Sequence, residues 1–249
     1  MNYKYIFLVC AHNCEQYIIT CLQSLFDQRY DDFGVIVVDD ASTDTTASVI
    51  KEFGKDKENF IVDVNDKRTG SAAWNQYKAV KKYVTNPESI ICIVDGDDYL
   101  TDPLSLNRLD RHIHSSVFAG FTGYTDPLNI CNKLGHTDMR KKNGPYHMRF
   151  FRAFLYDAVP EEMYYRDGEL IQAASDYAFI YPLIDLLGEK RIAMFLHPMM
   201  YYWRNNIDTN DHSMNYEEQK SNAVYIFNRE RLEELSDEQL RQLSDNYPR

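Results

Sequence analysis

The sequence predicts an α/β protein with a Rossmann-like, open and mostly parallel sheet flanked by helices. Two patterns favour this fold. In the first hundred residues, short apolar runs alternate with stretches whose apolar residues recur every three or four positions, as strands and amphipathic helices require. The links between them are short, so consecutive strands are expected to lie parallel with right-handed crossovers. With 249 residues and 44% hydrophobic content, the chain can bury one large core.

Four apolar runs are expected to form the strands of the first half, at residues 6–10, 35–38, 59–64 and 90–94. Three helices are expected between them. The first carries its apolar face from Cys14 to Phe26, and the second ends near Gly54, a residue type that suits a helix C-terminus. The third has an apolar stripe made of Trp74, Tyr77, Val80 and Val84.

The second half of the chain is less regular. Residues 115–126 predict one more strand, and residues 127–160 carry many turn residues without a sustained period, which is typical of functional loops. A helix is expected from Asp176, although Pro182 indicates a kink or a later start. Residues 191–204 predict an edge-type strand.

The tail from Met214 onward predicts helices. Ser236 and Gln239 fit a capping box, and a short apolar face is formed by Leu235, Leu240 and Leu243. The sequence contains no internal repeat and no obvious linker. One domain with an irregular second half is therefore the simplest division.

The charge balance excludes some classes of partner. The chain carries 27 basic and 38 acidic side chains, a formal net charge of −11. General binding to nucleic acid or to an anionic membrane needs a basic face, so neither is expected. An acidic protein can still bind an anionic small molecule when a metal ion supplies the local positive charge.

The cysteines and the N-terminus bear on the cellular compartment. The five cysteines are odd in number and form no CxxC pair, which favours reduced, buried thiols. The N-terminus is apolar only from Ile6 to Cys10, and no window reaches the roughly 18 to 20 apolar residues of a membrane span. We therefore expect a cytoplasmic protein without a transmembrane segment.

Three polar segments follow predicted strands: "CAHN" at residues 10–13, "DDASTD" at 39–44 and "DGDD" at 95–98. Ligands of open parallel sheets bind beyond the carboxyl ends of the strands, so these segments should lie at one edge. The chain has no GxGxxG after the first strand and no GxxxxGK[ST], so the main signatures of dinucleotide dehydrogenases and P-loop proteins are missing.

The segment "DGDD" crowds carboxylates that repel each other, and a divalent cation with hard oxygen ligands, Mg²⁺ or Mn²⁺, would offset their charge. Gly96 would leave room for a ligand between the acids. The alternative is a solvated turn in which Asp98 or Asp102 starts the next helix. An EF-hand loop is excluded because Leu100 and Leu106 stand where glycine and glutamate are needed.

The segment "DDASTD" leaves two hypotheses open. One of its carboxylates could bind a base N–H or a sugar hydroxyl. Alternatively, the segment only caps the following helix through Ser42 or Thr43.

Five segments, in this order and spacing, resemble glycosyltransferase family 2, the inverting, metal-dependent nucleotide-sugar transferases with the GT-A fold. They are "FLVCAHNCEQYIITCLQSLFDQ" (7–28), "VIVVDDASTDTT" (35–46), "AAWN" (72–75), "DGDDYL" (95–100) and "YYWRNN" (201–206). The resemblance implies one GT-A catalytic domain over residues 1–249. Residues 1–125 would bind the nucleotide-sugar, 126–213 would form the acceptor side and 214–249 a helical tail.

The resemblance also implies roles for single residues. The donor, expected to be a UDP-sugar, would be bound by Cys10, Ala11, His12, Asn13, Asp40, Gly70, Asn75, Asp95, Gly96 and Arg204. In that set Asp40 would hydrogen-bond the nucleobase, and Cys10 to His12 would line the base pocket through their backbone. Asp97 would ligate Mn²⁺ or Mg²⁺, with Asp95 and His212 as further members of the metal site. The acceptor would be a glycan, a protein or a small molecule, and the C-terminal helices could pair two copies of the chain.

An inverting transfer needs a base for the acceptor hydroxyl, and in this family it is an acid well after the D-x-D. Asp176 is the candidate, at a predicted helix start whose dipole would keep it ionised. The alternatives are a plain helix cap at Asp176 or a base among Asp167, Glu169, Glu161 and Glu162.

The chain departs from the family pattern at several positions. His12 replaces a tyrosine, Trp74 stands where arginine is common, and "AASD" lacks the glutamate of an E-D pair. We expect Trp74 to pack in the core rather than to stack on sugar. His212 could be structural, and Tyr201, Tyr202 and Trp203 could pack at the sheet edge.

Three other classes of protein compete with a transferase. The main alternative is a non-catalytic nucleotide-sugar or glycan-binding protein of the same fold. A phospho-acceptor signalling domain is disfavoured by the length of the chain and by the position of the acidic pair on the second strand. A phosphatase is disfavoured because no D-x-D follows the first strand.

Overall fold

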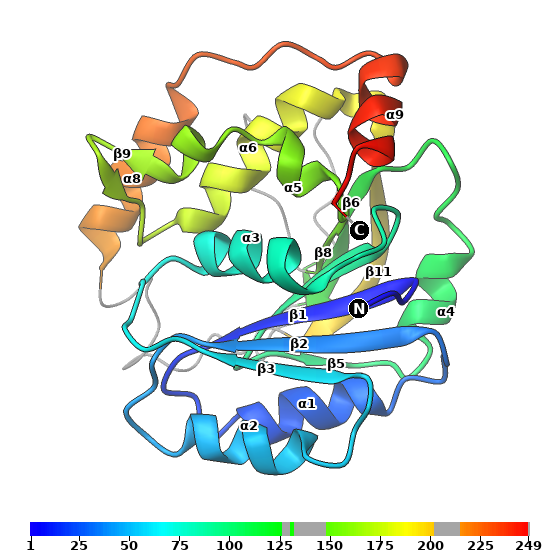
Figure 1. Ribbon diagram of the computed structural model, residues 1–249, viewed down its shortest axis with the longest axis vertical. Helices are drawn as coiled ribbons and strands as arrows, with labels where there is room; N and C mark the ends of the chain where they lie inside the picture. The colour runs from blue at the N-terminus through cyan, green and yellow to red at the C-terminus, as the bar shows by residue number, and fades with distance from the viewer. Residues whose placement is uncertain (126–129, 132–147, 202–214, 249) are drawn as a thin grey trace.

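A computed structural model describes residues 1–125, 130–131, 148–201 and 215–248. One sheet runs through the described part of the molecule, with strand order β3-β2-β1-β4-β8-β6-β11-β5 and β7 beside β6. Helices cover both of its faces (Figure 1). The predicted α/β class is confirmed.

The first half alternates strands and helices as expected. Its elements are β1 (Tyr5–Ala11), α1 (Ile18–Phe26), β2 (Phe33–Asp39), α2 (Thr46–Gly54), β3 (Phe60–Val64), α3 (Ala72–Tyr83) and β4 (Ile90–Asp95). The strands β1 to β4 pair in parallel without register shifts. The four predicted strands and three predicted helices are therefore confirmed.

Side chains of β1 explain why both faces of the sheet are covered. Successive residues of a strand point to opposite faces, and the residues of β1 from Tyr5 to Val9 are buried on both faces. Ile6 and Leu8 pack with α3 and α6 in one cluster, whereas Phe7 and Val9 pack with α1 and α2 in the other. A strand that is apolar on both sides is stable only between two layers of helices, which Figure 1 shows.

The second half builds the rest of the sheet. Its elements are β5 (Tyr99–Leu100), α4 (Ser105–Asp110), β6 (Ala119–Thr125), β7 (Ile130–Cys131), β8 (Arg149–Arg152), α5 (Leu155–Ala158), η1 (Glu161–Tyr164), β9 (Tyr165–Arg166), β10 (Glu169–Leu170), α6 (Ser175–Leu187), η2 (Glu189–Arg191), β11 (Ile192–Tyr201), α8 (Tyr216–Phe227) and α9 (Asp237–Asp245). Strand β8 lies antiparallel between β4 and β6. Strands β6 and β11 run parallel to each other and in the direction of β4, so the sheet is mostly parallel.

Three expectations for this half need correction. The turn-rich stretch 127–160 contains a central strand, β8, because four residues with buried phenylalanines suffice to span the gap between β4 and β6. Strand β11 is an edge strand only in part, since β5 pairs with its last two residues, Met200 and Tyr201. Helix α6 starts at Ser175 and runs through Pro182, so it does not start late. Burial of its apolar residues offsets the backbone bond that the proline lacks.

The last helix docks onto the body of the protein. The capping box at α9 is confirmed, because Ser236 Oγ accepts from the Gln239 N–H and Gln239 Oε1 accepts from the Ser236 N–H. Leu240 is buried in the core that α6 also contributes to. The apolar face of α9 is thus used within this chain, and pairing of two copies through these helices stays a prediction.

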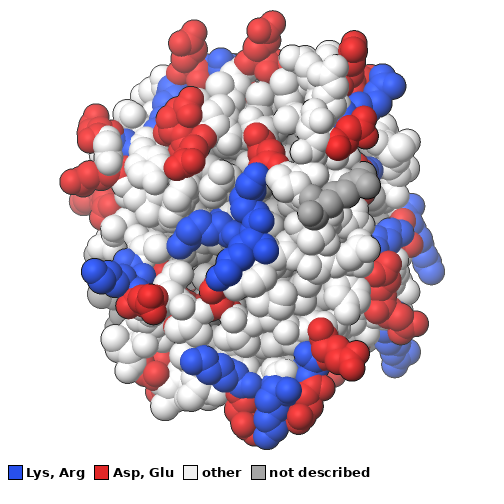
Figure 2. Space-filling model, viewed as in Figure 1, with Lys and Arg blue, Asp and Glu red and all other residues white. Residues whose placement is uncertain are grey.

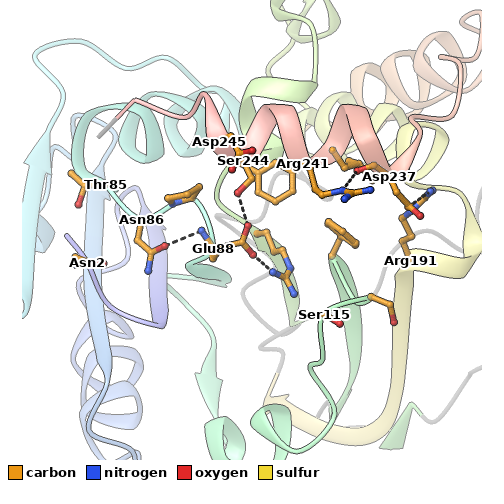
Figure 3. Close-up of a pocket in the computed structure, with 16 residues that line it drawn as sticks. Asn2, Thr85, Asn86, Glu88, Ser115, Arg191, Asp237, Arg241, Ser244 and Asp245 are labelled. Atoms are coloured by element: carbon orange, nitrogen blue, oxygen red, sulfur yellow. Dashed lines mark hydrogen bonds and ion pairs between the residues drawn. The ribbon is translucent and has the colours of Figure 1, made fainter.

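A cavity of about 1080 Å³ lies between α9 and the amino ends of the sheet strands (Figure 3). Four of its charged side chains form pairs, Arg191 with Asp237 at 2.7 Å and Arg152 with Glu88, and Ser244 donates to Glu88 at 2.6 Å. These bonds hold the tail against the sheet. The cavity is at the opposite end of the strands from the acidic segments.

Figure 2 shows a group of basic side chains near the centre of the face in view, in the region where Figure 1 draws α3. The last turn of α3 carries Lys81 and Lys82, which suits the negative end of the helix dipole. Lys81 pairs with Asp157, and Lys82 pairs with Asp63. The local positive charge is therefore offset by neighbouring acids. Among the described residues, no helix has both the length and the apolar composition needed to cross a membrane.

Candidate functional site

The carboxyl ends of β1, β2 and β4 meet at one edge of the sheet. Cys10 lies opposite Asp95, and Ala11 lies opposite Asp39. The Gly96 N–H donates to the Cys10 carbonyl at 3.0 Å, and the Asp40 N–H donates to the Ala11 carbonyl at 2.8 Å. The three polar segments that the sequence placed at one edge are therefore side by side.

Asp40 is buried at the centre of a hydrogen-bond network. Its Oδ1 accepts from Asn65 Nδ2 at 2.7 Å and from the Thr69 N–H at 2.9 Å. Its Oδ2 accepts from the Gly70 N–H at 2.8 Å and from Thr69 Oγ1 at 3.2 Å. Asn65 Nδ2 also donates to Asn75 Oδ1 at 3.0 Å. Three of the predicted donor-site residues, Asp40, Gly70 and Asn75, are thus joined through one loop.

These bonds set the charge state of Asp40. Burial alone raises its pKa, but the bonds from Thr69, Asn65 and Gly70 outweigh burial and hold the pKa of Asp40 below its ordinary value. A carboxylate has about four lone-pair positions, and the loop occupies four of them. Asp40 is therefore ionised and fixes the loop at residues 65–70. Its predicted bond to the nucleobase stays a prediction.

The segment after β2 ties itself to the segment after β1. Ser42 Oγ accepts from the Asn13 N–H at 2.9 Å, and Asn13 Oδ1 accepts from the Thr43 N–H at 2.8 Å. His12 Nδ1 lies 3.0 Å from the Asp40 carbonyl oxygen. The hypothesis that Ser42 or Thr43 caps α2 is wrong, because the two hydroxyls and the Thr43 N–H are used to join the two loops. The cap residue is Thr45.

The turn after β4 is tightly packed. The Asp98 N–H donates to the Asp95 carbonyl at 3.0 Å. A Cβ on Gly96 would lie 3.1 Å from the Cys10 carbonyl oxygen, from Ala11 Cβ and from Cys14 Sγ. The space beside Gly96 is filled by the chain itself, so the expectation that it is open for a ligand is wrong at this position. The glycine is required for packing.

The remaining acids of this cluster differ in surroundings. Asp95 and Asp97 are half-buried, whereas Asp98 is buried. Asp102 accepts from the Leu104 N–H at 2.8 Å and pairs with Arg108 Nε at 2.7 Å. The prediction that Asp102 starts the next helix is wrong, because α4 begins at Ser105 with Leu104 as its cap residue and Asp102 lies in the turn before it. Within the described ranges, no three His, Cys, Asp or Glu side chains are grouped as a metal site.

Asp176 lies in the first turn of α6, as predicted. Its side chain is 29% exposed, and its Oδ2 lies 3.2 Å from Nη1 of Arg149. Burial and the charge of Asp95 raise the pKa of Asp176, and the charge of Arg149 lowers it. The net result is a pKa above the ordinary aspartate value. The helix dipole therefore does not hold the pKa of Asp176 below its ordinary value, and the ionised state expected at this helix start stays a prediction.

The alternative bases are placed differently. Asp167 occupies the turn of the β9–β10 hairpin with its side chain 86% exposed. Glu161, Glu162 and Glu169 are also exposed. Of these five acids, only Asp176 is half-buried with an electrostatic coupling to Asp95. It is the one that the fold brings to the carboxyl edge.

Sequence reasoning missed Arg149, the first residue of β8. It is 5% exposed and lies opposite Ile93, two residues before the end of β4. Because β8 is antiparallel to β4, its amino end reaches the edge where β4 ends. The signal was a basic residue directly before the apolar pair Phe150-Phe151, which a search for strands ending in acids passed over.

Strained backbone is concentrated around this edge. Three non-glycine residues there have left-handed backbone, Asn13 (φ 48°), Ala41 (φ 57°) and Ala174 (φ 59°). They follow β1, follow β2 and precede α6. Such residues cost free energy and are common where a fold imposes a functional geometry.

Helices α3 and α6 meet at their amino ends. The Ala73 N–H donates to Ser175 Oγ at 3.4 Å. Trp74 stacks on Tyr77 with ring centres 5.1 Å apart and contacts Tyr164 edge-on at 5.5 Å. Trp74 therefore packs against the core, as expected.

Three of the four described cysteines behind the site are buried. Burial raises the pKa of the Cys10 thiol and of the Cys21 thiol, and it raises that of Cys14 to about 12. These residues and Cys92 are free cysteines. The predicted buried thiols are confirmed for Cys14, Cys21 and Cys92, whereas the residue Cys10 is half-buried.

The family model described as glycosyl transferase family 2 matches residues 6–166, more than half of the chain. The chain belongs to glycosyl transferase family 2. The match includes the three polar segments at residues 10–13, 39–44 and 95–98 and also Arg149. It ends ten residues before Asp176.

Curated relatives of this family 2 protein are similar over most of the chain. An uncharacterized glycosyltransferase of Mycoplasma pneumoniae is 26% identical over 186 residues, which cover 67% of this chain and 60% of the relative. The poly(ribitol-phosphate) beta-N-acetylglucosaminyltransferase TarS of Staphylococcus aureus is 25% identical over 217 residues, which cover 80% of this chain and 35% of TarS. The chain thus spans 60% or less of the length of these two relatives.

Solved structures share the fold of this family 2 protein. TarS 1–349 in complex with UDP matches with a TM-score of 0.60 and 22% identity, covering 98% of this chain and 70% of that one. The mannosyltransferase PcManGT from Pyrobaculum calidifontis, in complex with GDP-Man and Mn²⁺, matches with a TM-score of 0.65 and 17% identity, covering 91% and 63%. The likeness confirms the predicted GT-A fold. The predicted Arg204 and His212, together with Tyr202 and Trp203, lie outside the described residues.

Proposed function

We propose that this family 2 protein is a glycosyltransferase that moves a sugar from a nucleoside-diphosphate donor to an acceptor hydroxyl with inversion. One observation carries the proposal. Oδ2 of Asp176 lies 3.2 Å from Nη1 of Arg149, and the backbone of Arg149 pairs with Ile93, two residues before Asp95 at the end of β4. This supports a base candidate and a donor-side acid at the same edge of the sheet.

The donor is proposed to be a UDP-sugar. The structural neighbour TarS has been solved with UDP and with UDP-GlcNAc, whereas the neighbour PcManGT holds GDP-Man. The backbone of Cys10 to Asn13, tied to the segment after β2 by Ser42 and Thr43, would line the base pocket. Asp40 would shape that pocket by holding the loop at residues 65–70.

A divalent metal ion, Mn²⁺ or Mg²⁺, is proposed to be held by Asp97 and Asp95. The residues fit such an ion, because two half-buried carboxylates separated by a single glycine offer hard oxygen ligands. When bound, the ion would stabilise negative charge on the departing diphosphate. The other ligand positions would be left to the donor, and His212 stays a prediction.

Asp176 is proposed as the general base. Its carboxylate would accept the proton of the acceptor hydroxyl while that oxygen bonds to the anomeric carbon. The bond from this carbon to the donor phosphate oxygen breaks at the same time, and its electron pair leaves with the nucleoside diphosphate. The raised pKa of Asp176 supports this role, since a carboxylate with a higher pKa is a stronger base.

The experiment is a thermal-shift panel of UDP-glucose, UDP-GlcNAc and GDP-mannose with and without Mn²⁺, followed by a transfer assay with the stabilising donor. A ligand at 100 times its Kd stabilises by about 2.7 kcal/mol, so the true donor should raise Tm in the presence of metal. If no nucleotide-sugar shifts Tm under either condition, the proposal fails. If a donor binds but the protein never releases nucleoside diphosphate from it, the non-catalytic alternative is correct.

A further inference from the structure

Arg149 reaches the site from a strand that runs against its neighbours. In the part of the chain that the structure describes, the site edge is formed by the carboxyl ends of parallel strands and the amino end of β8. Arg149 is the first residue of β8 and lies opposite Ile93. This register places its side chain beside the end of β4, where Asp95 follows two residues later.

The ion pair between Arg149 and Asp176 can hold the Asp176 carboxylate in one orientation. Nη1 of Arg149 lies 3.2 Å from Oδ2 of Asp176, and the two side chains are 6% and 29% exposed. The guanidinium is therefore almost enclosed, whereas the carboxylate keeps one side open. A planar, multi-donor group of this kind fixes the direction of the carboxylate that it binds.

The charge of Arg149 also acts on Asp176 directly. It favours ionisation of Asp176 and opposes the effects of burial and of the Asp95 charge, which disfavour that ionisation. The same opposition acts on the Cys10 thiol, where the charge of Asp95 is opposed by that of Arg149. Arg149 is thus a buried cation that contacts the proposed base and lies beside the strand that ends in the donor-side acid.

We propose that Arg149 is a positioning residue, which orients Asp176 toward the acceptor hydroxyl and acts on the transfer step only through Asp176. This inference rests on the proposed function. A misplacement of about 1 Å in a reacting group can slow a reaction roughly 100-fold. The aliphatic chain of methionine fills much of the space of arginine without its charge or donors, so Arg149→Met removes the support.

The test is a double-mutant cycle on the transfer reaction, with Arg149→Met, Asp176→Asn and the double variant. We expect Arg149→Met to lower kcat about 10- to 100-fold while the donor KM changes less than about twofold. In the Asp176→Asn background, Arg149→Met should not lower kcat further, because the effects of substitutions at residues that act as one unit do not add. Arg149→Lys should recover part of kcat.

Arg152→Met is the matched control. It lies three residues further on the same strand, is ion-paired with Glu88, and lines the cavity at the opposite end of the sheet. We expect it to lower Tm without lowering kcat. If both arginine variants lower kcat in proportion to Tm, Arg149 is merely structural. Arg149→Lys, which keeps the charge and more of the packing, decides the case if Arg149→Met does not fold.

Other outcomes overturn the inference in distinct ways. An equal loss from Arg149→Met in both backgrounds would mean that Arg149 contacts the substrate directly. A raised donor KM with unchanged kcat would assign it to donor binding. If Asp176→Asn alone keeps the kcat of the unmodified protein, the base of the proposed function is wrong, whatever Arg149 does.

Discussion

The N–H of Gly70 donates to Oδ2 of Asp40 at 2.8 Å, which links a loop before α3 to the end of β2. The Thr69 N–H makes the same kind of bond to Oδ1 at 2.9 Å. The Asp40 carboxylate thereby accepts the backbone N–H groups of two consecutive loop residues, as backbone carbonyls do elsewhere. A loop held in this way has one conformation only while Asp40 is ionised.

Asp40→Asn should destabilise the protein by about 1 to 3 kcal/mol, because an amide nitrogen replaces an acceptor of buried N–H donors. The pKa of Asp40 is lowered in the folded state, so its stabilising effect is present above the ordinary aspartate pKa and is lost as pH falls toward the folded-state value. In urea unfolding between pH 3 and 7, the free energy of unfolding should fall less steeply with decreasing pH for the variant than for the unmodified protein. Asp63→Asn, at a surface ion pair, is the control. Equal curves for Asp40→Asn and the unmodified protein would contradict the role of the network.

Gly96→Ala should destabilise the protein by about 1 to 3 kcal/mol, because the added methyl group meets three atoms at 3.1 Å, one of them a backbone oxygen. It should also weaken donor binding, since any shift moves Asp95 and Asp97 together. Equilibrium unfolding and titration with the donor measure the two effects. Unchanged stability would show that the turn after β4 has room that this structure does not give it.

The pH profile of transfer should report Asp176. Because its pKa is raised above the ordinary value of 3.8, kcat/KM should fall with decreasing pH at a midpoint above that value. Asp176→Asn should remove this acid limb and lower kcat by about 100- to 10,000-fold. Steady-state rates of the unmodified protein and of Asp176→Asn, measured from pH 4 to 8, test this prediction. An acid limb that survives in Asp176→Asn belongs to another group.

Leu240→Ala should cost about 2 to 5 kcal/mol, because this α9 side chain is 1% exposed and packs into the core beside α6. Leu104→Ala is the matched control, since that leucine is 37% exposed and its loss should stay within about 0.5 kcal/mol. Thermal and urea unfolding provide the comparison. A small effect at Leu240 would mean that α9 folds independently of the body.

Local pattern determined most of the fold. The alternation of apolar runs and helical spacing up to residue 95 predicts β1 to β4 and α1 to α3, because each of these elements buries side chains in its own period. The same logic found β6, α6 and α9. It did not find β8, since four residues within a turn-rich stretch carry too little period to be recognised.

The site divides in the same way. The acids at the ends of β2 and β4 could be found from sequence, because a charge directly after a buried strand is a local signal. Only tertiary structure decided that Asp40 is engaged by residues 65–70, that Gly96 packs against Cys14, and that Arg149 meets Asp176. Those contacts join residues 25 to 82 positions apart. Strand and helix periods can be recognised from neighbouring residues. Burial and pairing between residues this far apart depend on how the layers of the fold pack, and no local pattern predicts that packing.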